Sequence, residues 1–190
     1  MLNRVRDMIH RWAALRNVIL LWVIFSGFSI IVFNFGFLSK LEKQSRGNII
    51  LDNTYYFYTV DHVNQLFTTF GNTGRTLYLL HLLIFDFIYP VLFFVTNAVS
   101  LVCLLNYLIP AAKITNHIHL LPLVPAVLDY LENFGILFLL ASYPNLHPAV
   151  VAMTSLATII KLSLVNILFL LTIALTAGAF VKFIHWKIKQ

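Results

Sequence analysis

The feature that most constrains the fold is a set of four long apolar segments, at about residues 18–38, 77–105, 120–141 and 149–180. About 20 predominantly apolar residues are enough for a helix to cross the hydrocarbon core of a bilayer. Of the 190 residues, 60% are hydrophobic and 11% are charged, and a soluble domain of this size could not bury so many apolar side chains. The segments lack the alternation of transmembrane strands. We therefore expect an all-α membrane protein, built as a four-transmembrane-helix bundle.

Basic residues flank the apolar segments and indicate an orientation. Residues 1–16 carry four arginines and residues 182–190 carry three lysines, whereas the loop at 39–76 mixes four basic residues with three acidic ones. Basic flanks tend to stay in the cytoplasm. We therefore expect an N-in, C-in topology in a prokaryotic cytoplasmic (inner) membrane, with residues 1–16 as a cytoplasmic flank and 182–190 as a cytoplasmic tail. The net charge of +6 then reflects contact with the lipid bilayer, and no nucleic acid partner is expected.

A cleaved signal peptide is the alternative interpretation of the N-terminal region. The apolar run at residues 18–38 is longer than the roughly 7–15 residues of a signal-peptide core, and no small-residue cleavage site follows it. The run is therefore interpreted as the first transmembrane helix.

A short interfacial amphipathic helix is expected at about residues 60–70, inside the first extracytoplasmic loop. Thr59 can cap its start and Gly71 can end it. Apolar residues recur on one face at helical spacing, and polar residues occupy the other face. We expect this helix to rest in the membrane interface or to cover the bundle, beside an aromatic belt formed by the tyrosines of residues 55–58.

The third apolar segment contains the sequence Leu-Asp-Tyr-Leu-Glu-Asn at residues 128–133. Asp129, Glu132 and Asn133 are spaced i, i+3, i+4 and therefore share one helix face. A carboxylate near the middle of a membrane costs about 2.5–3.5 kcal/mol on insertion scales, so both acids need partners. Lys161, near the middle of the fourth segment, is the natural one.

The second apolar segment adds Asp86, Pro90 and Asn97. Pro90 should free a main-chain carbonyl one turn earlier and kink the helix near Asp86. Asp86 and Asn97 are eleven residues apart, which at ~100° per residue places them on nearly the same side. Three intramembrane carboxylates against one lysine leave excess negative charge. Such a site requires protonation of a carboxylate, a bound cation or entry of water.

Histidine and nucleophile patterns point to no further site. His117 and His119 are two residues apart and would point to different sides of a helix, so no metal and no cofactor are expected. His81 is interpreted as an interface residue rather than a general base, and Asp52 with Asn53 as a turn. No Ser-His-Asp arrangement is present.

Several motifs carry a family resemblance. They are Phe-Gly-Asn-Thr-Gly-Arg at 70–75, Phe-Asp-Phe-Ile-Tyr-Pro at 85–90, Leu-Pro-Leu-Val-Pro at 121–125, the motif at 128–133, Tyr-Pro at 143–144, and Thr158 with Lys161. Together they resemble a family of small four-helix bacterial and archaeal membrane proteins without an assigned function. The resemblance implies the fold and a shared polar core but no substrate. A looser likeness, in span number and acid placement only, links the chain to the sterol-isomerase-like and sigma-2-receptor-like group.

These observations leave three functional hypotheses open beside a purely structural ion-pair network. The first is a polar pocket at mid-membrane that binds an amphipathic lipid-like or cationic ligand. Its expected ligand-binding residues are Asp86, Asp129, Glu132, Asn133, Lys161, Arg75, Tyr78, Tyr89 and Asn97. Arg75 and Tyr78 would lie at the outer mouth, beneath the helix at 60–70.

The second hypothesis is a lipid-modifying enzyme that uses a carboxyl group as general acid or base. Its catalytic candidates are Glu132, Asp129, Asp86 and Lys161. The third is an accessory or assembly subunit, whose charges would meet a membrane partner chain or a second copy in a homo-oligomer.

Overall fold

The computed structural model describes residues 2–35, 37, 40–41, 50–110 and 117–189. Four helical segments are long and apolar enough to cross a membrane: Leu15–Asn34, Val60–Leu108, Ile118–Ser142 and Pro148–Ile188. The chain is thus an all-helical integral membrane protein, as expected from its apolar segments. The helical elements are α1 (Leu2–Trp12), α2 (Leu15–Ile30), η1 (Ile31–Phe35), η2 (Leu51–Asn53), α4 (Val60–His81), η3 (Leu82–Asp86), α5 (Tyr89–Leu108), η5 (Ile118–Leu120), α6 (Leu123–Ser142) and α7 (Pro148–Ile188).

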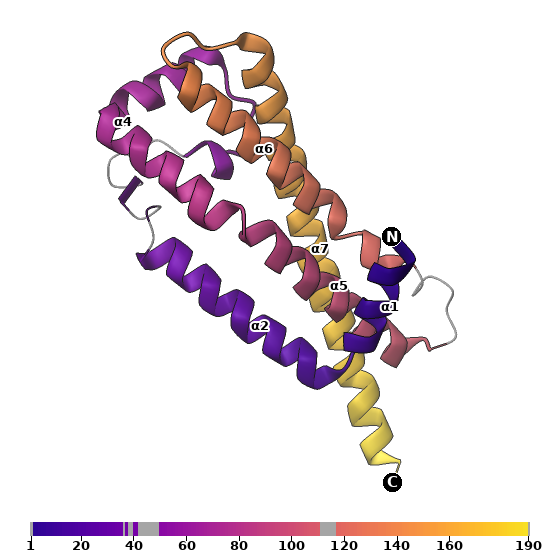
Figure 1. Ribbon diagram of the computed structural model, residues 1–190. Coiled ribbons are helices and arrows are strands. Elements are labelled where there is room, and N and C mark those ends of the chain that lie inside the picture. The colour runs from indigo at the N-terminus through magenta and orange to yellow at the C-terminus, as the bar shows by residue number, and fades with distance from the viewer. Residues whose placement is uncertain (1, 36, 38–39, 42–49, 111–116, 190) are drawn as a thin grey trace.

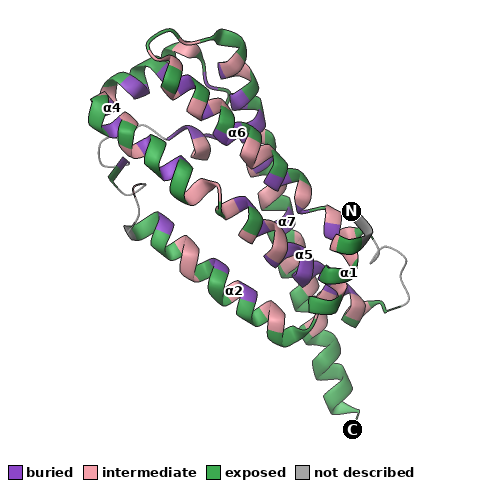
Figure 2. Ribbon diagram, in the orientation of Figure 1, coloured by how far each residue is buried: buried purple, intermediate pink, exposed green. Residues whose placement is uncertain are grey.

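Two helix pairs organise the bundle. Figure 1 shows α2 lying alongside α5, and α6 lying alongside the first half of α7, the most extensive helix contact in the structure. Gly135 of α6 permits this contact, because a Cβ atom there would lie 2.1 Å from Thr154 Oγ1 on α7. Small residues let membrane helices approach closely in this way. Buried residues face the inside of the bundle, and long exposed apolar stripes face outward (Figure 2).

The helix bounds differ from the expected ones at several places. The N-terminal flank forms helix α1, whose Ile9 is buried against α2 and α5. Helix α7 does not end near residue 180 but runs on to Ile188. In this last part, Lys182 Nζ donates to the main-chain oxygens of Tyr107 (2.6 Å) and Leu108 (3.2 Å) at the end of α5. Parts of the expected first span (residues 36 and 38), first loop (39 and 42–49) and second link (111–116) lie outside the described residues.

The second membrane-spanning segment is not a single regular helix. Gly71 interrupts α4 with φ 60° and ψ −170°, a backbone conformation that is essentially restricted to glycine. The residues before this break are helical as the first part of α4, and apolar side chains on them are buried: Val63, Leu66 and Phe67 are at most 1% exposed. These side chains therefore pack into the core of the protein itself.

The loop before α4 is also part of the core. Tyr58 is 1% exposed, and its main-chain N–H donates to Ser155 Oγ on α7 (2.9 Å). The expectation that Tyr58 belongs to an aromatic belt was therefore wrong, whereas Tyr55 and Tyr56 are exposed. The loop folds inward because its polar main chain finds hydroxyl partners on α7. This packing brings η2 against the middle of the bundle.

Candidate functional site

An ion-pair cluster joins α6 to α7. Lys161 Nζ lies 3.2 Å from Asp129 Oδ1 and closer still to Glu132 Oε2. The hydroxyl of Thr158 donates to the other Glu132 oxygen at 2.5 Å, so both oxygens of this fully buried carboxylate have partners. The partnership that the sequence predicts between Lys161 and the two acids is confirmed.

The kink predicted at Pro90 is present, and α6 satisfies the carbonyl groups that the kink exposes. Residues 82–86 form the π-helix η3, and a turn leads to Tyr89. Asn133 Nδ2 donates to the main-chain oxygen of Asp86 (3.0 Å), and Tyr130 OH donates to that of Phe87 (2.6 Å). Because buried carbonyls need partners, these two side chains hold the turn against α6.

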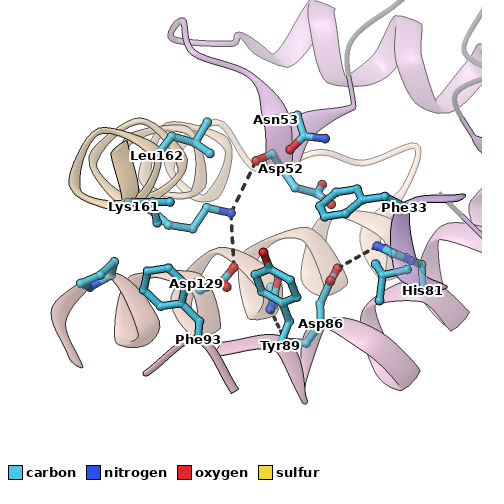
Figure 3. Close-up of a pocket in the computed structure, with 14 residues that line it drawn as sticks. Phe33, Asp52, Asn53, His81, Asp86, Tyr89, Phe93, Asp129, Lys161 and Leu162 are labelled. Carbon is cyan, nitrogen blue, oxygen red and sulfur yellow. Dashed lines mark hydrogen bonds and ion pairs between the residues drawn. The ribbon is translucent and has the colours of Figure 1, made fainter. Parts of the chain in front are cut away.

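His81 and Asp52, which the sequence does not predict to be in the site, lie beside Asp86. His81 Nε2 lies 3.3 Å from Asp86 Oδ2, and Tyr78 OH donates to a carboxylate oxygen of Asp52 in η2. Lys161 Nζ also approaches the main-chain oxygen of Asp52 at 3.5 Å. Figure 3 shows Asp52, His81 and Asp86 converging from three elements. The sequence alone predicts a turn residue at Asp52 and an interface residue at His81.

These groups surround a cavity of about 170 Å³. A water molecule occupies about 30 Å³ in the liquid, so the cavity has room for a few waters or for one small polar group. Its wall consists of Val32, Phe33, Asp52, Asn53, His81, Asp86, Tyr89, Phe93, Pro125, Asp129, Asn133, Lys161, Leu162 and Val165. Glu132 is not part of this wall. Like Asp129, it forms an ion pair with Lys161, and Lys161 lines the cavity.

The polar groups around the cavity do not balance in charge. Asp52, Asp86, Asp129 and Glu132 provide four carboxylates, whereas Lys161 provides the one permanent cation within contact distance of them among the described residues. At close range and low dielectric, like charges repel strongly. The arrangement therefore favours binding of protons or of a positively charged group.

Besides Glu132, three predicted site residues do not line the cavity. Asn97 is buried and donates to the main-chain oxygen of Phe93 (2.9 Å). The turn at residues 87–88, between Asp86 and Asn97, breaks the regular 100° spacing. Arg75 donates to the main-chain oxygen of Phe67 (2.8 Å) and stacks 4.4 Å above the Tyr143 ring. Arg75 thereby links the two helical parts on either side of Gly71.

Tyr78, the third such residue, is fully buried, and it is linked to the site by the hydrogen bond that its hydroxyl donates to Asp52. Its expected place at an outer mouth was wrong because α4 carries it into the core cluster. By contrast, Asp86, Tyr89, Asp129, Asn133 and Lys161 line the cavity, and their role in ligand binding stays a prediction.

The spacing of His81 and Asp86 gives no signal for their contact. Five residues apart, they would lie about 140° from each other on an α-helix, so helical spacing argues against contact. A π-helix has its hydrogen bonds from i to i+5 and brings such positions together. Only the π-helix η3 makes their 3.3 Å contact possible.

No family model, no curated protein and no solved structure matches this chain. The family resemblance drawn from the motifs therefore stays a prediction.

Proposed function

We propose that this membrane protein binds an amphipathic, lipid-like ligand whose small cationic or hydrogen-bonding head group enters the cavity beside Asp86 and Asp129. The observation that supports this most is the excess of carboxylates around the cavity. Pockets for complete drug-sized ligands measure about 300–1,000 Å³, so a cavity of about 170 Å³ suits only the polar end of such a molecule.

Apolar side chains provide a place for the tail of the ligand. Val32 and Phe33 at the end of the first span and Leu162 and Val165 on α7 complete the cavity wall. An acyl or isoprenoid chain leaving the cavity would contact these groups and then lipid. In this proposal the cavity lies within the hydrocarbon layer, the chain has both ends in the cytoplasm of a prokaryotic inner membrane, and the helix before Gly71 rests at the outer interface.

A binding experiment with a simple amphiphile tests the proposal. The full chain in lipid nanodiscs is titrated with dodecyltrimethylammonium in the presence of a chelator, and binding is followed by calorimetry. We expect saturable binding that Asp129→Asn and Asp86→Asn each weaken, because each removes a carboxylate from the cavity wall. Asp61→Asn is the matched control, since Asp61 is exposed on α4. Equal binding by all four proteins would contradict the proposal.

A membrane-embedded enzyme that modifies lipids is the second candidate. The contact between His81 Nε2 and Asp86 Oδ2 favours it, because a carboxylate that orients an imidazole is a common arrangement of a general base. Loss of turnover of a co-purifying lipid in His81→Gln, with retained binding, would select this candidate. The third hypothesis, an assembly subunit, has less support, because the charged groups meet each other inside one chain.

A further inference from the structure

Asp52, His81 and Asp86 form a cluster of metal-ligating groups at one end of the cavity. One ligand atom from each residue lies within 4.8 Å of the others. The three residues come from η2, from the end of α4 and from η3, so the fold rather than one local motif brings them together. His81 is only 2% exposed, and its ring faces the carboxylate of Asp86 (Figure 3).

The charges around the cavity divide into two groups. Asp129 and Glu132 both form ion pairs with Lys161. The carboxylates of Asp52 and Asp86 make no contact with a lysine or arginine side chain among the described residues, and their one basic neighbour is His81. Holding two half-buried carboxylates beside one imidazole is costly unless a cation joins them.

Two polar atoms of the cluster also lack hydrogen-bond partners within the described part of the chain. They are His81 Nδ1 and Asp86 Oδ2, whose 3.3 Å contact with His81 Nε2 lacks hydrogen-bond geometry, and both atoms are buried. Buried polar atoms without partners are rare in folded proteins and require an explanation, such as an ion or a water molecule. A bound cation would satisfy the Asp86 oxygen directly.

We propose that Asp52, His81 and Asp86 bind one divalent transition-metal ion, such as Zn²⁺ or Mn²⁺, whose remaining coordination positions face the cavity. One imidazole nitrogen with two carboxylate oxygens suits these ions better than Ca²⁺ or Mg²⁺, which prefer oxygen alone. Metal–ligand bonds of about 2.0–2.1 Å at tetrahedral angles separate two ligand atoms by about 3.3 Å. His81 Nε2 and Asp86 Oδ2 are 3.3 Å apart.

The surroundings of Asp52 resemble those of a metal ligand. Tyr78 is fully buried, and its hydroxyl donates to one oxygen of the Asp52 carboxylate. Hydrogen bonds of this kind orient the ligands of metal sites, and removing one weakens metal affinity by about 10-fold to 100-fold. Three protein ligands with an open position are typical of zinc sites at which a further molecule binds.

The experiment uses the full chain with its purification tag removed, stripped with a chelator and titrated with Co²⁺ and then Zn²⁺. We expect one Co²⁺ ion per chain, seen as visible absorption bands that Zn²⁺ abolishes. Asp52→Asn, His81→Gln and Asp86→Asn should each weaken binding by at least about 10-fold. Metal should also raise the melting temperature of the wild type and leave that of Asp86→Asn unchanged.

Three further variants keep the test decisive. His62→Gln is the matched control, because His62 lies on the same helix, has an unpartnered ring nitrogen and is outside the cluster, so binding should stay unchanged. His117→Gln excludes surface binding. Tyr78→Phe keeps all three ligands and should still weaken binding, which guards against misfolding of the ligand variants. Absence of binding at one ion per chain, or wild-type affinity in all three ligand variants, would overturn the inference.

The inference uses the cavity of the proposed function but not its ligand. Metal titrations contain no amphiphile, and the amphiphile titrations contain chelator. Failure of one experiment therefore leaves the other intact, and a protein that passes both would hold a metal ion at the point where a ligand head group enters.

Discussion

The side-chain amide of Asn133 donates a 3.0 Å hydrogen bond to the main-chain oxygen of Asp86. Pro90, four residues after Asp86, has no N–H and cannot make the helical bond to this oxygen. Helix α6 therefore replaces a hydrogen bond that the second span lacks. Together with the bond from Tyr130 to the main-chain oxygen of Phe87, this contact fixes the backbone that carries Asp86 into the cavity, so the kink and the site share the same support.

Asn133→Leu should destabilise the protein by about 1–2 kcal/mol, because the carbonyl of Asp86 is left buried without a donor. The measurement is the free energy of unfolding in mixed micelles, followed by helical circular dichroism. In a Pro90→Ala background, a main-chain N–H becomes available to Asp86, and Asn133→Leu should cost clearly less. Additive effects of the two substitutions would contradict this account, since coupled residues show interaction energies of about 0.5–3 kcal/mol.

Glu132→Gln should be among the most damaging single changes, at about 3–5 kcal/mol, because it leaves the buried Lys161 charge with Asp129 alone. Asp129→Asn should cost less, since the Asp129 side chain is 17% exposed and Glu132 remains paired with Lys161. The free energy of unfolding again provides the comparison.

The double variant Glu132→Gln with Lys161→Met tests whether the pair is kept for stability. Replacing both members of a buried ion pair is often neutral or stabilising. Because Lys161→Met also leaves Asp129 without its cation, Asp129→Asn is added, and we expect this triple variant to recover most of the stability lost in Glu132→Gln. If it remains as unstable as Glu132→Gln, the cost does not arise from an unpaired lysine.

Gly71→Ala should destabilise the protein by about 1–3 kcal/mol, because φ 60° with ψ −170° is strained for any residue with a Cβ atom. Gly27→Ala is the matched control. Gly27 lies inside α2 with nothing within 4 Å of the added methyl group, so helix propensity should make this change neutral or stabilising. Thermal unfolding of the two variants distinguishes them, and equal melting temperatures would contradict the strain at Gly71.

The sequence was sufficient for those features that have a single large energetic cause. Apolar length predicts the four spans, since nothing but a membrane accommodates such segments. The cost of a buried charge predicts the contact of Lys161 with Glu132, and the missing N–H of Pro90 predicts the kink at Asp86. Each of these follows from one residue type and needs no knowledge of how distant segments pack.

The positions of Asp52 and His81 in the site depend instead on long-range packing and on an irregular helix. Asp52 reaches the cavity only because the loop around Tyr58 folds onto α7, a contact between residues about a hundred positions apart in sequence. His81 meets Asp86 through a π-helix, for which spacing gives no local signal. The sequence predicts Arg75 at the mouth of the pocket, but its guanidinium group donates to the main-chain oxygen of Phe67, across the break at Gly71.

Gly135→Ala tests the close contact of α6 and α7, on which the distance between Glu132 and Lys161 depends. The new methyl group would lie 2.1 Å from Thr154 Oγ1 and 2.9 Å from Thr154 Cγ2, so the helices must move apart. Overpacking of this kind costs about 1–3 kcal/mol. The free energy of unfolding should fall accordingly, and the affinity of the cavity for a cationic amphiphile should fall with it.

Thr154→Ala in the same chain removes both clashing atoms and should restore most of the lost stability. By itself Thr154→Ala should cost little, because its hydroxyl bonds only to the main-chain oxygen of Val150 in its own helix. Gly178→Ala is the control on α7, where an added methyl group would meet Leu108 at an ordinary 3.7 Å. If Gly178→Ala proves as damaging as Gly135→Ala, or if Thr154→Ala fails to rescue, then close packing at Gly135 does not set the spacing of the two helices.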